Sequence, residues 1–213
     1  MSESGEGDDG LFVVFEGIDG AGTSTQIDRW ARALRARKRL VHVTREPSGG
    51  PVGSLIRLVL TGRISLPARS AGAMALLFAA DRLDHLESEV APLLRDGYVV
   101  ISDRYDLSSL TYQTTTADEE KAAVAWVREL NKYARRPDVT LILNASPEVA
   151  ANRRRLRGGP IELYDDNDLQ ARLAAAYRRA DEFVPKDKLL HVDGDGDVDA
   201  VATAVAAALE PFL

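Results

Sequence analysis

A short apolar run that leads through a glycine-rich loop into an amphipathic helix is the feature that most constrains the fold. Residues 11–15 read Leu-Phe-Val-Val-Phe, which is typical of a buried strand. Glycines follow at 17, 20 and 22, and from Ser24 onward apolar residues recur on one helical face. A strand, a glycine loop and a helix in this order predict a site where backbone N–H groups at the helix N-terminus hold phosphate.

Further apolar runs and amphipathic stretches alternate along the chain. The pattern predicts strands at 41–44, 98–102, 139–143 and 189–192, and helices at 54–60, 71–95, 117–133, 147–155, 169–183 and 198–209. Pro92 is expected to bend its helix or to start a new turn. Because the strands lack polar alternation, we expect an α/β fold whose parallel sheet is covered by helices on both faces. No linker or repeat is visible, so 11–213 should form one domain after a disordered tail at 1–10.

Composition limits the chemistry and the partners of this domain. The 213 residues include no cysteine, which excludes a disulfide framework, a thiolate zinc site and a cysteine nucleophile. A formal net charge of −6 disfavours a general nucleic-acid or anionic-membrane surface. The first ten residues are acidic, and no apolar run approaches the length needed to span a bilayer. We therefore expect a cytoplasmic protein whose phosphate binding is local.

Residues 17–24 have the spacing of the phosphate-binding motif GxxxxGK[ST], with one departure. Thr23 stands where the motif has lysine, whereas Ser24 retains the hydroxyl that can ligate Mg²⁺. An ordinary glycine-rich turn is the alternative, but the surrounding strand and helix favour a phosphate loop. The residues expected to bind the nucleotide cofactor are Gly17, Gly20, Ala21, Gly22, Thr23, Ser24 and Thr25.

The segment from Phe15 to Gln26 resembles the opening of thymidylate kinases. Other segments agree with that family in order and spacing: Thr44–Gly49 with Gly53 and Arg57, Leu77–Arg82, Asp103–Tyr105 with Ser108–Ser109 and Tyr112–Gln113, and Pro137–Asp138. The resemblance covers about 11–183. It implies a three-layer P-loop nucleoside-monophosphate-kinase-like fold with a short arginine-rich lid at about 153–162. It also implies transfer of phosphate from ATP to dTMP with Mg²⁺, no role for nucleic acid or membrane, and a homodimer.

The resemblance also implies roles at the phosphates. Asp103 would help Ser24 to position Mg²⁺, and Arg104 would bind the acceptor phosphate with Arg57 as a second contact. Asp19 would lie near the 3′-hydroxyl of the acceptor or its metal. Two alternatives stay open: Asp103 and Arg104 could form a structural ion pair, and Asp19 could simply cap the following helix.

The remaining implied contacts concern the thymine and the sugar. Phe78 would stack on the base and Arg82, one helical turn later, would bind a base carbonyl. Ser109 and Gln113 would contact the base edge, and Tyr112 would pack on the sugar and disfavour a 2′-hydroxyl. The implied acceptor-binding set is Glu46, Pro47, Arg57, Phe78, Arg82, Arg104, Ser109, Tyr112 and Gln113. A core phenylalanine beside a solvated arginine is the alternative for Phe78 and Arg82.

Thr23 removes one positive charge from the phosphate loop. Loss of such a contact costs about 10²–10³ in rate. We expect a lid arginine, Arg153 or Arg157, to supply the charge, so the implied catalytic set is Asp19, Arg104, Arg153 and Arg157. A solvated basic face is the alternative for these lid arginines. For the whole chain, the alternatives are a nucleotide-binding pseudokinase and a kinase of another or modified pyrimidine monophosphate.

Overall fold

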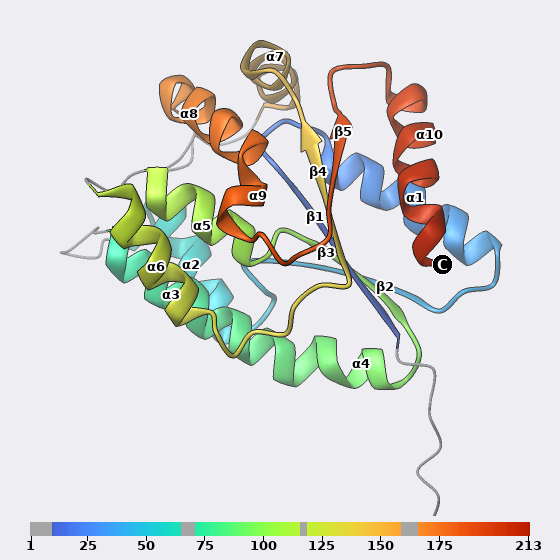
Figure 1. Ribbon diagram of the computed structural model, residues 1–213, viewed down its shortest axis with the longest axis horizontal. Coiled ribbons are helices and arrows are strands. Elements are labelled where there is room, and N and C mark those ends of the chain that lie inside the picture. The colour runs from blue at the N-terminus through green and yellow to red at the C-terminus, as the bar shows by residue number, and fades with distance from the viewer. Residues whose placement is uncertain (1–9, 65–70, 116–118, 159–165) are drawn as a thin grey trace, which may run out of the picture.

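The computed structural model describes residues 10–64, 71–115, 119–158 and 166–213. In this part of the chain a five-stranded parallel sheet forms the centre, in the order β2-β3-β1-β4-β5 (Figure 1). The strands are β1 (Leu11–Gly17), β2 (Val41–Arg45), β3 (Val99–Asp103), β4 (Val139–Asn144) and β5 (Leu189–Asp193). All four strand pairs are parallel, so the carboxyl ends of the strands meet at one edge of the sheet.

Helices cover both faces of the sheet. The two helices α1 (Thr23–Ala36) and α10 (Val198–Leu209) pack together on one side, and most other helices lie on the opposite side (Figure 1). These others are α2 (Pro51–Leu60), α3 (Ala71–His85), α4 (Ala91–Arg95), α5 (Asp106–Thr115), α6 (Glu120–Leu130), α8 (Asn167–Arg178) and α9 (Ala180–Phe183). Helix α7 (Pro147–Arg157) follows β4 above the phosphate loop. The three-layer α/β prediction is confirmed.

The central strand β1 is buried on both faces. Phe12 packs against Tyr105 with ring centroids 5.2 Å apart, in a cluster that also contains Leu94. Phe15 points to the other face, where its ring centroid lies 6.0 Å from that of Trp30 on α1. Because successive strand residues alternate between faces, a continuous apolar run is what a doubly covered strand requires.

Several element boundaries differ from the sequence prediction. The helix expected at 71–95 is divided by a π-helical turn at Leu86–Val90, after which Pro92 occupies the first turn of α4, where a missing N–H costs nothing. Helix α5 was not predicted, because its serines and threonines hide the apolar periodicity. The helix at 169–183 is two helices, α8 and α9. Of the tail expected at 1–10, residues 1–9 lie outside the described residues, as do lid residues 159–162; Gly10 is described and its N–H donates to the carbonyl oxygen of Leu94 at 2.9 Å.

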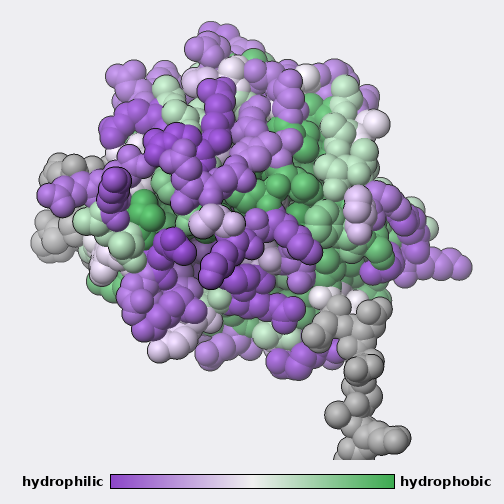
Figure 2. Space-filling model, viewed as in Figure 1, coloured by the Kyte–Doolittle hydropathy of each residue, from purple (hydrophilic) through white to green (hydrophobic). Residues whose placement is uncertain are grey.

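The visible surface is mainly hydrophilic, with a paler hydrophobic strip over alanine-rich α10 (Figure 2). Among the helices that the structure describes, none combines the length and the apolar character needed to cross a membrane.

Candidate active site

The glycine loop between β1 and α1 forms the floor of a cleft of about 1200 Å³. Gly20 and Gly22 have φ angles of 91° and 101°, in the left-handed region that suits glycine. A Cβ atom on Gly20 would lie 2.4 Å from the carbonyl oxygen of Ala150, so no other residue fits there. The seven residues expected to bind the nucleotide run from the end of β1 through this loop into the first turn of α1, and six of them, Gly20 to Thr25, line the cleft. We call it the donor cleft.

Ser24 and Asp103 meet at one side of the donor cleft. The Ser24 hydroxyl donates to Asp103 Oδ2 at 2.5 Å, across 79 residues of sequence. Asp103 ends β3, and β3 lies next to β1 in the sheet, which explains the encounter. The described residues contain no group of three or more His, Cys, Asp or Glu that could hold a metal. A hydroxyl and one carboxylate nevertheless suit Mg²⁺, which keeps several waters and takes further oxygens from phosphates.

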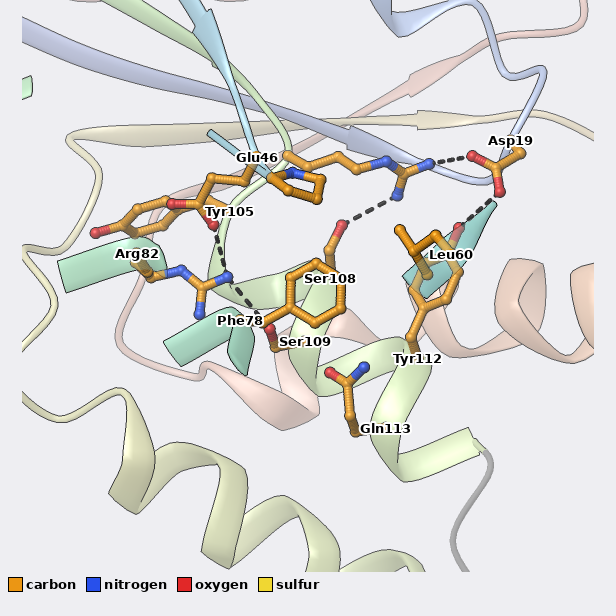
Figure 3. A pocket seen from close by; sticks show the side chains of 12 residues that line it. Asp19, Glu46, Leu60, Phe78, Arg82, Tyr105, Ser108, Ser109, Tyr112 and Gln113 are labelled. Atoms are coloured by element: carbon orange, nitrogen blue, oxygen red, sulfur yellow. Dashed lines mark hydrogen bonds and ion pairs between the residues drawn. The ribbon is translucent and has the colours of Figure 1, made fainter. Parts of the chain in front are cut away.

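A second cleft of about 580 Å³ lies beside the first (Figure 3). Its walls come from the ends of β1, β2 and β3 and from helices α2, α3 and α5. The lining residues include Asp19, Glu46, Pro47, Phe78, Arg82, Arg104, Ser109, Tyr112 and Gln113. We call it the acceptor cleft. The structure therefore brings together eight of the nine implied acceptor-binding residues.

Arg57, the ninth, lies just behind the cleft wall. Its guanidinium donates to the carbonyl oxygens of Pro47 and Ser48 at 2.6 Å and 2.5 Å. Pro47 itself lines the cleft.

Arg82 is buried, with only 1% of its side chain exposed. Its Nη2 lies 2.7 Å from Glu46 Oε2 and donates to Ser109 Oγ at 3.2 Å, and its Nη1 donates to Asn131 (Figure 3). Burial alone would lower the pKa of Arg82, but the nearby carboxylates, Glu46 foremost, raise it. The alternative of a solvated arginine is therefore wrong.

Arg104 points from the end of β3 into the space between the two clefts. Its Nη2 donates to Asp19 Oδ1 at 2.5 Å, its Nη1 donates to Ser108 Oγ at 3.0 Å, and its guanidinium carbon lies 5.3 Å from the centre of the Tyr112 ring. Asp103, by contrast, receives the Ser24 hydroxyl. The alternative of a structural ion pair between Asp103 and Arg104 is wrong, because Asp103 binds Ser24 whereas Arg104 binds Asp19.

Asp19 organises the junction of the clefts. Its carboxylate also accepts from the Tyr112 hydroxyl and from Gln170 Nε2, both at 3.1 Å. The Asp19 N–H donates back to Gln170 Oε1 at 3.1 Å. No side chain caps α1, so the alternative helix-cap role for Asp19 is wrong.

Two site residues, Gln170 and Tyr177, were missed in the sequence. Both are buried in α8, and the Tyr177 hydroxyl accepts from Arg104 at 3.3 Å. Their spacing of seven residues puts two polar side chains on the apolar face of one helix. Buried polar residues at this spacing in a helix could have indicated in the sequence that Gln170 and Tyr177 belong to the site.

Glu16 lies fully buried directly behind this junction. Its Oε1 accepts from the backbone N–H groups of Tyr105 and Ser108, and its Oε2 accepts from the hydroxyls of Ser108 and Tyr177. Burial raises the pKa of Glu16 to about 7, although Arg104 and the hydrogen bonds oppose the rise. Glu16 thus links β1 to α5 and α8 beneath the residues that hold Arg104.

The arginines at the end of α7 have two environments: some contact the glycine loop and others are exposed to solvent. Arg153 Nη1 donates to the carbonyl oxygens of Ala21 and Gly194 at 3.0 Å and 2.8 Å. Arg154 donates to the carbonyl of Asp19 at 2.6 Å. Arg157 lines the donor cleft from an exposed position, whereas Arg155 pairs with its helical neighbour Asn152. A simple solvated basic face is therefore wrong for Arg153 and Arg154.

The fold and these clefts define a class of protein. A glycine loop at the carboxyl edge of a parallel sheet, next to a second cleft that shares charged residues with it, suits a transferase that holds two substrates side by side.

The family follows from comparison with known proteins. A model of the thymidylate kinase family matches residues 15–205, and the chain belongs to that family. It is 39% identical to a putative thymidylate kinase of Treponema pallidum, over 89% of this chain and 90% of that protein. It is 38% identical to a probable thymidylate kinase of Thermococcus kodakarensis, over 95% and 98%. A thymidylate kinase of Ruegeria pomeroyi is 40% identical over 92% of each chain.

Proposed function

We propose that this protein transfers the γ-phosphoryl group of ATP to dTMP, giving ADP and dTDP. The observation that carries the proposal is the meeting of the two clefts. Asp19 and Arg104 are the residues common to the described linings of both, so the two clefts adjoin at a point where a phosphoryl group could pass directly from one to the other. Transfer between two anions needs positioning and charge neutralisation above all, and both are available at this junction.

The donor cleft would take ATP. Backbone N–H groups of the glycine loop and the N-terminus of α1 would bind the phosphates. Ser24 and Asp103 would hold Mg²⁺ or its water shell, and that ion would neutralise charge on the transferred group. Arg153 and Arg157 would close the cleft from the end of α7.

The acceptor cleft would take dTMP. Arg104 has the central position for the acceptor phosphate, with Arg57 behind it. Phe78 would stack on the thymine, and Arg82 with Ser109 and Gln113 would present hydrogen-bonding groups to the base edge. No general base is required, because the acceptor phosphate is already an anion.

Tyr112 would act on the sugar. Its ring lies against Arg104 and its hydroxyl binds Asp19, which fixes the ring at the cleft wall. A ring held in this way would pack on a deoxyribose and leave less room for a 2′-hydroxyl. Asp19 itself would lie near the 3′-hydroxyl.

A homodimer through α3 and α6 is part of the proposal. Leu76 on α3 is 53% exposed and Trp126 on α6 is 39% exposed, while the two helices pack side by side. Contiguous exposed apolar surface marks an interface between subunits, and we propose that Leu76 and Trp126 contribute to such a surface. Light scattering should give twice the 23.2 kDa chain mass, and Leu76→Glu should shift the mass toward that of the monomer.

The test of the activity is an ADP-release assay with ATP, Mg²⁺ and a panel of nucleoside monophosphates. ADP release should depend on dTMP and should fall sharply with Asp103→Asn. Tight nucleotide binding without ADP release would favour the pseudokinase reading, against which the paired Ser24 and Asp103 now stand. A clear preference for dCMP or GMP would overturn the acceptor assignment.

A further inference from the structure

Thr23 leaves the phosphate loop without its lysine, and its side chain offers no substitute charge. It is the first residue of α1, and its methyl carbon lies 3.5 Å from where a Cβ on Gly17 would be. The methyl group therefore faces the base of the loop. A positive charge at the transferred phosphoryl group must come from another element.

We propose that Arg154 is the catalytic cation that replaces the missing lysine; this rests on the proposed phosphoryl transfer. Arg154 approaches the loop from α7, and its Cγ lies 3.1 Å from where a Cβ on Gly20 would be. Its Nη1 donates to the carbonyl oxygen of Asp19 at 2.6 Å. Asp19 is one of the residues shared by the two clefts, so the guanidinium lies beside the path of the phosphoryl group.

The hydrogen bonds of Arg154 leave its charge available. Its second partner is the side-chain oxygen of Asn167 at 2.9 Å, so both of its partners are neutral. Within the described ranges no carboxylate forms an ion pair with Arg154. A guanidinium has five N–H donors, and three of those on Arg154 make no hydrogen bond to the residues that the structure describes. They can bind phosphate oxygens in the forked geometry that arginine favours.

The other two candidates fit this role less well. Arg153 donates to Ala21 in the glycine loop and to Gly194 and Gly196 between β5 and α10, so its guanidinium is held between these two loops by three backbone carbonyls and, within the described residues, makes no hydrogen bond to Asp19. Arg157 lies one turn further along, at the exposed end of α7. For the role of the missing lysine, the structure thus favours Arg154 over Arg153 and Arg157, the two arginines expected from the sequence.

The test is charge rescue, measured as kcat, KM for both nucleotides, and melting temperature in the full-length protein. Arg154→Gln keeps a polar side chain on α7 but carries no charge, so kcat should fall about 10²–10³-fold. Adding Thr23→Lys to Arg154→Gln should restore kcat to within about tenfold of the original protein, because lysine returns the charge to the loop. Arg155→Ala, on the same helix but bonded only to Asn152 among the described residues, is the matched control and should leave kcat unchanged.

Two results would overturn the assignment. One is a kcat for Arg154→Gln within about threefold of the original, since a lost transition-state contact costs far more. The other is a slow double variant with native melting, since a lysine in the loop of a folded protein should have returned the missing charge. Absence of dTMP-dependent ADP release in the unmodified chain would instead reject the proposed function and this inference together. If the unmodified protein releases ADP and the Arg154→Gln variant keeps the same kcat, the inference is rejected but the proposed function is not.

Discussion

The acceptor cleft and the donor cleft carry their positive charge in different ways. Arg82 and Arg104, in the acceptor cleft, each pair with a carboxylate. Arg153 and Arg154, against the donor loop, donate to neutral oxygens, and neither forms an ion pair within the part of the chain described. A paired charge holds geometry and hydrogen-bond direction, whereas an unpaired one adds net charge. The paired arginines of the acceptor cleft suit the base and single phosphate of the proposed dTMP. The unpaired arginines of the donor cleft suit the more highly charged triphosphate of the proposed ATP.

The comparison predicts that the acceptor cleft is the more fragile. Arg82→Ala would remove the arginine partner of the buried Glu46 carboxylate and leave His85, whose Nδ1 lies 3.4 Å away; loss of one partner of a buried pair costs about 3–5 kcal/mol. Denaturant unfolding of the variant measures this loss.

Arg128→Ala is the exposed control for Arg82, with an expected change within about 0.5 kcal/mol. Combining Arg82→Met with Glu46→Gln removes both charges and should recover much of the stability. If Arg82→Ala is as stable as the original protein, the ion pair between Arg82 and Glu46 does not stabilise this cleft.

Arg104 should affect catalysis more than any other acceptor residue. Its φ of 76° suits glycine, so Arg104→Gly removes the side chain without backbone strain. We expect kcat/KM for dTMP to fall about 10²–10³-fold, from loss of the central phosphate contact. Steady-state kinetics with ATP varied separately should show a much smaller change in KM for ATP. An equal effect on both substrates would contradict the division between the clefts.

Glu16 makes the acceptor side depend on pH. Its pKa rises from 4.5 to about 7 on folding, so the native state binds more protons between these values. The stability that Glu16 contributes is therefore fully present below about pH 4.5 and is lost as pH rises through about 7, by up to roughly 3 kcal/mol.

Glu16→Gln isolates this effect. The amide oxygen can keep the two backbone N–H donors, and the amide NH₂ can donate to the hydroxyls of Ser108 and Tyr177. The free energy of unfolding of the variant, relative to the original, should increase from pH 4.5 to 7. Parallel stability curves for the two proteins would show that Glu16 stays ionised in the native state.

Arg153→Ala should give the smallest effect of this series. Its hydrogen bonds go to neutral backbone carbonyls, each worth about 1 kcal/mol net, so we expect a stability loss of about 1–2 kcal/mol. KM for ATP should rise about tenfold, equivalent to 1.4 kcal/mol of binding, with kcat little changed. Calorimetric binding of ATP checks this value. A stability loss as large as that of Arg82→Ala would remove the contrast between the two clefts.

Much of the fold followed from local sequence. The apolar runs predicted all five strands because strands covered on both faces have no polar alternation. The glycine loop was visible because only glycine fits its backbone angles and its approach to Ala150. Helix α5 was missed, since its serines bind Arg82, Arg104 and Glu16, and Thr111 and Thr114 donate to carbonyl oxygens of the same helix, so these polar side chains are buried without an apolar pattern.

The sequence by itself determined the order of elements, the phosphate loop and the missing lysine, because these depend on neighbouring residues. Only the tertiary structure decided which distant side chains meet. Gln170 reaches Asp19 across 151 residues, and Arg154, rather than Arg153 or Arg157, lies beside the carbonyl of Asp19. Neighbouring arginines on a helix point about 100° apart, so their roles depend on how α7 packs over the loop, which no local pattern specifies.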